Sequence, residues 1–166
     1  EGGIVNTSLL ATSLGWTGPH IAGYLNEGRM PKRLGTAHPH LVPYQTFNAK
    51  DGAILIAAGN DRLFARLCRV LDVPEWITDS RFAGNRDRLG NRLVLIALLN
   101  ERIGEEKRDV WIAKFNAAGV PCGPVNTIPE VLKEQQVADL GILKEVPGKG
   151  VKLAGMPIRF DGERTK

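Results

Sequence analysis

The 166-residue chain is 43% hydrophobic and 24% charged, with a formal net charge of +4 at pH 7, a composition that suits a globular domain able to bury a core. No apolar run approaches the ~20 residues that a membrane-spanning helix needs, aromatic residues make up only 6% of the chain, and Lys and Arg are scattered along it. These features argue against a membrane protein and against a nucleic-acid surface built from stacked aromatic side chains.

The first third of the sequence predicts helix, then loop, then a hairpin. Residues 6–27 carry apolar side chains at helical spacings, with Asn6 or Thr7 as the N-cap, and Gly15, Gly18 and Pro19 predict one broken helix or two. Residues 28–40 are expected to be loop. An Asp-Gly turn signal between YQTFNA and AILIAA predicts a hairpin with strands at 43–48 and 53–58.

Helices follow the hairpin. The spacing predicts helices near 61–71, 86–104 and 107–118, with a short helical turn at 74–76. The side chains expected to face inward are Leu63, Phe64, Leu67, Cys68 and Leu71 in the first helix, Leu89, Leu93, Ile96, Leu99 and Ile103 in the second, and Val110, Trp111, Phe115 and Ala118 in the third.

The last part of the chain mixes extended and helical segments. Residues 120–127 are expected to be extended and 128–139 to be a helix. Residues 142–146 and 151–160 are expected to be strands joined by a turn at PGKG. Together these elements predict an α+β fold with a short antiparallel sheet and several packed helices.

Two histidines, spaced H-x-H at His38 and His40, mark the most unusual stretch, GTAHPH. A metal site is not favoured, because zinc needs three or four ligands and the flanking residues offer no Cys, Asp or Glu. A general base needs an oriented partner, which the sequence does not reveal. A polar surface turn and a loop that covers a ligand both remain open.

Two further motifs have an ordinary structural interpretation. AAGND at 57–61 could place an anion at a helix N-terminus, but a strand–turn–helix junction is favoured because the glycine spacing of a phosphate loop is absent. Cys122 in PCGPV could be a nucleophile, but a rigid connector is favoured. Cys68 is expected to be a buried thiol, and two cysteines form no disulfide framework, so a reducing cytoplasm is the expected location.

Four segments in order carry a resemblance: KDGAILIAAGNDRLFARLCRVLDVPEW, DSRFAGNRDRLGNR, AAGVPCGPVNTIPEVLKEQQV and GKGVKLAGMPIRF. Over about residues 2–160 the chain resembles the class III CoA-transferases, a family that includes formyl-CoA transferases, carnitine CoA-transferases and methylacyl-CoA racemases. The segment KRLGTAH…VPYQTF leans toward the glutarate CoA-transferases that use succinyl-CoA.

The resemblance implies a small α+β domain beside a large Rossmann-like domain, in two chains that interlock as a homodimer. It implies residues 1–34 as a helical linker from the large domain, 35–140 as the small domain and 141–166 as a return segment. The family's catalytic aspartate lies in the large domain, and neither Asp51 nor Asp61 matches its motif. Because residue 1 is Glu and a structured-looking segment follows at once, we expect a fragment or a processed product. Because the resemblance places the aspartate outside this chain, it implies that the fragment is inactive alone and has no catalytic residue of its own.

The resemblance also implies the substrates. CoA would pass from an acyl-CoA to a free carboxylic acid, with succinyl-CoA and glutarate as the finer expectation, and with no permanent cofactor, metal or nucleic acid. A racemase of the same family or a stand-alone binding module are the alternatives. In the formyl-CoA transferases a glycine-rich loop at this place covers the active site, which implies the same role for Gly35, Thr36, Ala37, His38, Pro39 and His40.

Overall fold

The computed structural model describes residues 2–160 and 162–164. The chain separates into two compact units, residues 1–36 and residues 37–166. Helices combine with small antiparallel sheets, which confirms the predicted α+β class. The assignment of residues 1–34, 35–140 and 141–166 to parts of a two-domain protein stays a prediction.

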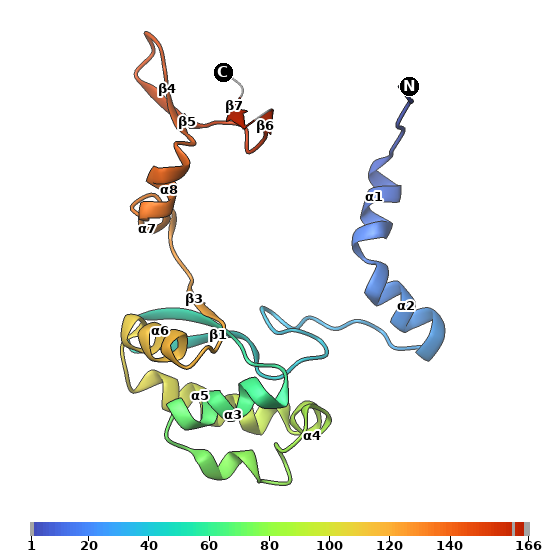
Figure 1. Cartoon of the computed structure of the whole chain (residues 1–166). Helices are drawn as coiled ribbons and strands as arrows, with labels where there is room; N and C mark the ends of the chain where they lie inside the picture. Colours follow the sequence, from blue (N-terminus) through green and yellow to red (C-terminus); the bar gives the residue numbers. More distant parts are fainter. Residues whose placement is uncertain (1, 161, 165–166) are drawn as a thin grey trace. The chain divides into compact units, whose positions relative to one another are not determined.

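The first unit contains two short helices, α1 (Leu9–Trp16) and α2 (Gly18–Glu27), so the predicted break is confirmed (Figure 1). The Ser8 hydroxyl, rather than Asn6 or Thr7, caps α1 by accepting the Ala11 N–H at 3.2 Å. Among the described residues α1 buries no side chain, and Trp16 is 86% exposed. An apolar helix with no buried face is typical of a segment that packs against further protein.

The second unit is built on an antiparallel sheet in the order β1-β2-β3. The predicted hairpin is confirmed, with Phe47 opposite Ile54 in the register. The segment predicted only as extended contributes the third strand, in which Cys122 lies opposite Ile56. The strands are β1 (Tyr44–Ala49), β2 (Gly52–Ala57) and β3 (Cys122–Pro124).

Helices cover one face of this sheet. Phe47 and Ile54 are buried on that face, while Asn48 and Leu55 point the other way and are exposed, the alternation expected of a half-buried antiparallel sheet. Helix α5 packs against β1, and α6 packs against β2 and β3 (Figure 1). The elements between β2 and β3 are α3 (Asp61–Val70), the 3₁₀-helix η1 (Pro74–Ile77), α4 (Asn85–Gly90), α5 (Arg92–Gly104) and α6 (Arg108–Ala117).

The segment predicted as one helix over 86–104 is two helices that meet at Asn91. Leu99 and Ile103, predicted to face inward, are fully buried, whereas the prediction that Leu93 faces inward is wrong, because Leu93 is 85% exposed. Leu95 is fully buried in its place and shares a stripe with Leu99 and Ile103. In α6 the inward face is formed by Trp111 and Phe115, whereas Val110 is exposed.

The helix predicted over 128–139 is also two short helices. An extended Glu134 separates them, and the Thr127–Glu130 capping box begins the first. The predicted hairpin around PGKG is confirmed, but its second strand ends at Ala154, ahead of Pro157, which has no N–H to donate to a strand ladder. The elements are α7 (Ile128–Val131), α8 (Gln135–Leu140), β4 (Leu143–Val146), β5 (Val151–Ala154), β6 (Arg159–Phe160) and β7 (Glu163–Arg164).

None of the helices in the described part of the chain is both long and apolar enough to cross a membrane.

A matched pair of substitutions on α5 tests this packing. Leu95→Ala should lower the free energy of unfolding by about 2–5 kcal/mol, because it removes a fully buried side chain and leaves a cavity. Leu93→Ala should change that free energy by less than about 0.5 kcal/mol, because its side chain is exposed. Urea titration followed by circular dichroism measures both. Equal losses would show that α5 presents a different face to the sheet.

Candidate functional site

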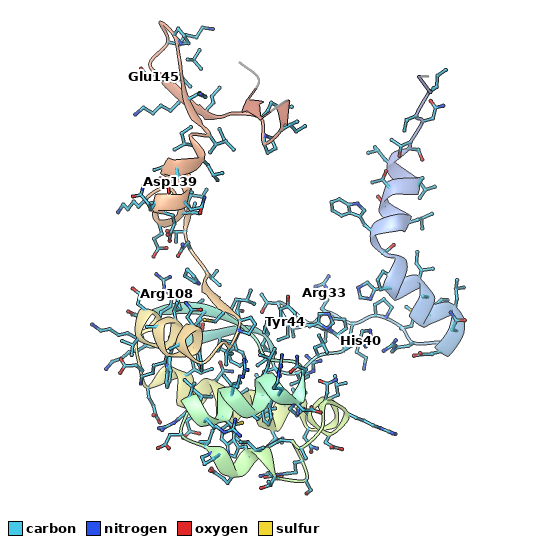
Figure 2. All side chains as sticks on the ribbon, viewed as in Figure 1. Arg33, His40, Tyr44, Arg108, Asp139 and Glu145 are labelled. Atoms are coloured by element: carbon cyan, nitrogen blue, oxygen red, sulfur yellow. The ribbon has the colours of Figure 1, made fainter. Side chains whose placement is uncertain are left out.

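The GTAHPH stretch forms a turn that leads into β1. Gly35 has φ 60°, the left-handed conformation that glycine adopts without steric cost. Gly35 and Thr36 end the first unit, and Ala37 to His40 begin the second. Ala37 and His38 are half-buried, whereas Pro39 and His40 are exposed. Figure 2 shows the His40 and Tyr44 side chains on this turn and on the strand that follows it.

The ring of His38 is held by its neighbours. Its Nδ1 accepts the His40 backbone N–H at 3.1 Å, and its ring stacks on Tyr44 with centroids 5.2 Å apart and planes at 13°. The His38 N–H donates to the Tyr44 carbonyl at 2.8 Å. Because Nδ1 is an acceptor, the neutral ring carries its proton on Nε2, which makes Nε2–H a hydrogen-bond donor with a fixed direction.

Side chains from α4 and α5 hold the backbone of the turn from outside. Asn85 donates from Nδ2 to the His40 carbonyl at 2.9 Å and accepts the Val42 N–H on Oδ1 at 3.1 Å. Arg92 Nη2 donates to the His38 and Pro39 carbonyls at 2.8 and 3.2 Å. The turn is therefore fixed through its peptide groups.

Arg88 continues this set of contacts into the core, where it is 0% exposed. Its Nε donates to the Val42 carbonyl at 2.7 Å and its Nη1 to the Phe82 carbonyl at 2.8 Å. Its Nη2 reaches the Gly59 carbonyl at 3.3 Å and the Asp61 carboxylate at 2.6 Å. One buried cation thus joins the turn, the end of β2, the start of α3 and the loop before α4.

The AAGND motif has the predicted role of a strand–turn–helix junction. A Cβ on Gly59 would lie 2.6 Å from the Leu41 Cβ, so glycine lets this junction lie against the turn. The Asn60 side chain caps α3 by accepting the Leu63 N–H at 2.9 Å. With Asp61 paired to Arg88 as well, the start of α3 is occupied by the protein's own oxygens rather than left open for an anion.

Neither cysteine has the environment of a nucleophile. Burial raises the pKa of Cys68 to about 12, and burial also raises the pKa of Cys122. The Cys122 Sγ points to the Ile112 carbonyl at 3.9 Å and the Asn116 Oδ1 at 3.7 Å. An activated thiol needs a lowered pKa, so the connector interpretation of PCGPV is the one that fits.

Acidic side chains do not supply a site here either. Asp51 accepts the Arg108 N–H at 2.7 Å, and Asp61 is paired with Arg88. Across the described residues, no group of three or more His, Cys, Asp or Glu side chains is placed to hold a metal ion.

Three residues of this site, Asn85, Arg88 and Arg92, were not predicted from the sequence. They recur at helical spacing within NRDRLGNR, and Arg88 lies seven residues before Leu95, on the same stripe as the buried leucines. An arginine at position 88, where the helical pattern places an apolar side chain, was a signal that this residue is buried. Patterning alone does not find it, because an isolated Arg is normally assigned to the surface.

Comparison with known proteins places the chain in an enzyme family. The model of CoA-transferase family III matches residues 1–166. Human succinyl-CoA:glutarate CoA-transferase is 38% identical over 163 residues, which cover 96% of this chain and 37% of that protein. Acetyl-CoA:oxalate CoA-transferase of Acetobacter aceti is 32% identical over 162 residues, which cover 98% of this chain and 41% of that protein.

A solved structure agrees with this placement. A CaiB/BaiF family protein from Brucella suis superposes with a TM-score of 0.78 and 40% sequence identity, over 92% of this chain and 40% of that chain. The chain therefore spans about two fifths of the length of the relatives it matches.

Removing the buried guanidinium tests its structural role. Arg88→Met should lower the free energy of unfolding by about 3 kcal/mol or more, because several buried carbonyls lose their donor. Arg86→Met, at an exposed position of the same helix, is the matched control and should change it by less than about 0.5 kcal/mol. Chemical denaturation measures both. A loss for Arg88→Met no larger than that of the control would contradict this role.

Alkylation tests the thiol environments. At pH 8 a pKa of about 12 for Cys68 leaves roughly one thiolate in ten thousand, so iodoacetamide should leave Cys68 unmodified in the native protein. Peptide mass spectrometry should find both cysteines alkylated in urea. Rapid native labelling of Cys68 would show that α3 is not packed as described.

Proposed function

Because the chain belongs to CoA-transferase family III, we propose that it forms the smaller domain of an enzyme that moves CoA from an acyl-CoA to a free carboxylic acid. The observation that supports this proposal most strongly is the match of the family model to residues 1–166. The named relatives act between an acyl-CoA and glutarate or oxalate, which supports a dicarboxylic acid as acceptor, with succinyl-CoA as a donor to test first. CoA enters as a substrate, and no permanently bound cofactor is proposed.

The nucleophile in this proposal is an aspartate of polypeptide outside these 166 residues. Its carboxylate attacks the thioester carbonyl, expels CoA thiolate and forms a mixed anhydride. The thiolate then attacks the aspartyl carbonyl, which releases the first acid and leaves an aspartyl-CoA thioester. The second acid attacks that thioester and expels CoA thiolate, which forms a second anhydride. The thiolate then attacks the acyl carbonyl of this anhydride, which releases the new acyl-CoA and regenerates the aspartate carboxylate. Covalent catalysis thus divides one exchange into easier steps.

Residues 35–40 are proposed to cover the reacting groups. Anhydrides and thioesters hydrolyse if water reaches them, so a cover that excludes water protects them. The fixed turn suits this task because its peptide groups are already bonded to α4 and α5. The Nε2–H of His38 is proposed to donate to the acid's carboxylate or to the oxyanion that develops during attack.

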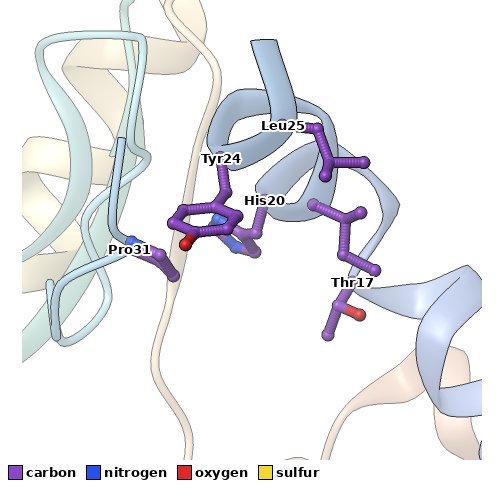
Figure 3. A pocket seen from close by; sticks show the side chains of 6 residues that line it. Thr17, His20, Tyr24, Leu25 and Pro31 are labelled. Carbon is purple, nitrogen blue, oxygen red and sulfur yellow. The ribbon is translucent and has the colours of Figure 1, made fainter. Parts of the chain in front are cut away.

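The apolar surface of the first unit supports a further polypeptide partner. Leu9 and Trp16 of α1 are 90% and 86% exposed. A pocket of about 340 Å³ lies beside α2 and is lined by Thr17, His20, Ile21, Tyr24, Leu25 and Pro31 (Figure 3). Contiguous exposed apolar side chains mark an interface. We assign this apolar surface as the contact with the large domain, within an interlocked homodimer.

The two free thiols, Cys68 and Cys122, suit a reducing cytoplasm.

CoA transfer should require both this chain and the large-domain polypeptide. The chain joined to large-domain polypeptide should transfer CoA from succinyl-CoA to glutarate or oxalate, and the chain alone should not, as followed by chromatography of the acyl-CoA pool. In the joined protein, His38→Ala should lower kcat/KM for the acid by roughly tenfold or more, since a preorganised donor to a developing oxyanion contributes strongly.

Two variants sharpen that measurement. His38→Gln keeps a donor near the Nε2 position and should recover part of the loss, whereas Arg86→Ala, at an exposed position of α4 outside the turn, should leave transfer unchanged. An unchanged rate and an unchanged KM for the acid after His38→Ala, with His40→Ala added, would exclude the turn from the reaction. Racemisation of a 2-methylacyl-CoA without CoA transfer would point to the racemase branch instead.

A further inference from the structure

Arg92 lies at the junction of α4 and α5. It is the first residue of the 13-residue helix α5, where its positive charge meets the positive end of the helix dipole. The Arg92 side chain is half-buried, and this burial lowers the pKa of its guanidinium. Among the described residues no carboxylate forms an ion pair with it.

Side-chain hydrogen bonds of Arg92 go to the turn. Its Nη2 donates to the His38 carbonyl at 2.8 Å and to the Pro39 carbonyl at 3.2 Å. The first carbonyl belongs to the His38–Pro39 peptide and the second to the Pro39–His40 peptide. The His40 N–H, one peptide further on, donates to His38 Nδ1, so the backbone position that Arg92 fixes also fixes the direction of the His38 ring.

Local rules of helix stability are commonly broken where a protein needs a residue for function. A cation at a helix N-terminus, half-buried and without a carboxylate partner in the described chain, breaks two such rules at once. Arg88 and Asn85 already tie Val42 and His40 to the core. Arg92 adds hydrogen bonds to the carbonyls of His38 and Pro39.

We propose that Arg92 is a positioning residue for the reaction, which holds the His38–Pro39 peptide so that the Nε2–H of His38 meets the acid substrate. This inference rests on the proposed function of the turn. Arg92 acts through His38 and not by contact with substrate, so its effect must depend on the presence of the His38 ring.

A double-mutant cycle tests this dependence in the protein that carries the large domain. Arg92→Met should lower kcat/KM for the acid by about tenfold to a hundredfold, the range that a charge-assisted hydrogen bond supports. In a His38→Ala background the same substitution should cost less than about twofold, because the group that it positions is already gone. Arg92→Lys should recover part of the rate by restoring one donor.

Arg86→Met is the matched control, since Arg86 is exposed on the neighbouring helix α4, and it should have no effect in either background. Equal losses from Arg92→Met with and without His38 would overturn the proposal, because a merely structural residue acts additively. So would a loss from Arg86→Met as large as that from Arg92→Met.

Amide exchange separates this proposal from the proposed function. By NMR, the His40 N–H should exchange at least about tenfold faster after Arg92→Met, since its bond to His38 Nδ1 opens more often, and at the wild-type rate after Arg86→Met. If CoA transfer is absent from the wild-type protein but His40 exchange responds, the proposed function fails and the positioning geometry stands. If CoA transfer is present and neither the rate nor the exchange responds to Arg92→Met, the positioning role fails and the proposed function stands.

Discussion

The guanidinium of Arg88 lies entirely inside the second unit and donates to carbonyls of three separate segments while pairing with Asp61. A buried cation is tolerated only when its hydrogen bonds are satisfied, so these segments must come together for Arg88 to be buried at all. The turn before β1, the junction after β2 and the loop before α4 are therefore fixed relative to one another. This constraint gives the H-x-H turn a defined shape, although the turn itself is exposed at Pro39 and His40.

The elements that the sequence predicted well are those whose signals are local. The hairpin at 44–57 follows from an Asp-Gly turn between two strand-forming runs, and α3 follows from an apolar stripe after a capping Asn60. On α5 the predicted inward face was right at Leu99 and Ile103 and wrong at Leu93, where Leu95 is buried instead. The buried stripe includes Arg88, and a pattern of apolar and polar residues does not predict a buried Arg.

The site shows the same division between local and long-range signals. GTAHPH could be singled out from its composition, but its partners Asn85 and Arg92 lie more than 40 residues away in sequence. Pairings of that kind depend on how α4 packs beside the turn, which single-sequence patterns do not encode. The family resemblance supplied the expected role of the loop, while the hydrogen bonds that hold it come only from the folded chain.

We propose that this chain is one part of a CoA-transferase whose nucleophile lies on other polypeptide. The most direct test is mass spectrometry of the two parts, mixed as separate polypeptides, incubated with succinyl-CoA and quenched in acid. The account predicts a succinyl or CoA adduct on an aspartate of the added polypeptide and none on this chain. An adduct on Asp51, Asp61 or another carboxylate of this chain, or no adduct on either part of a mixture that still consumes succinyl-CoA, would contradict it.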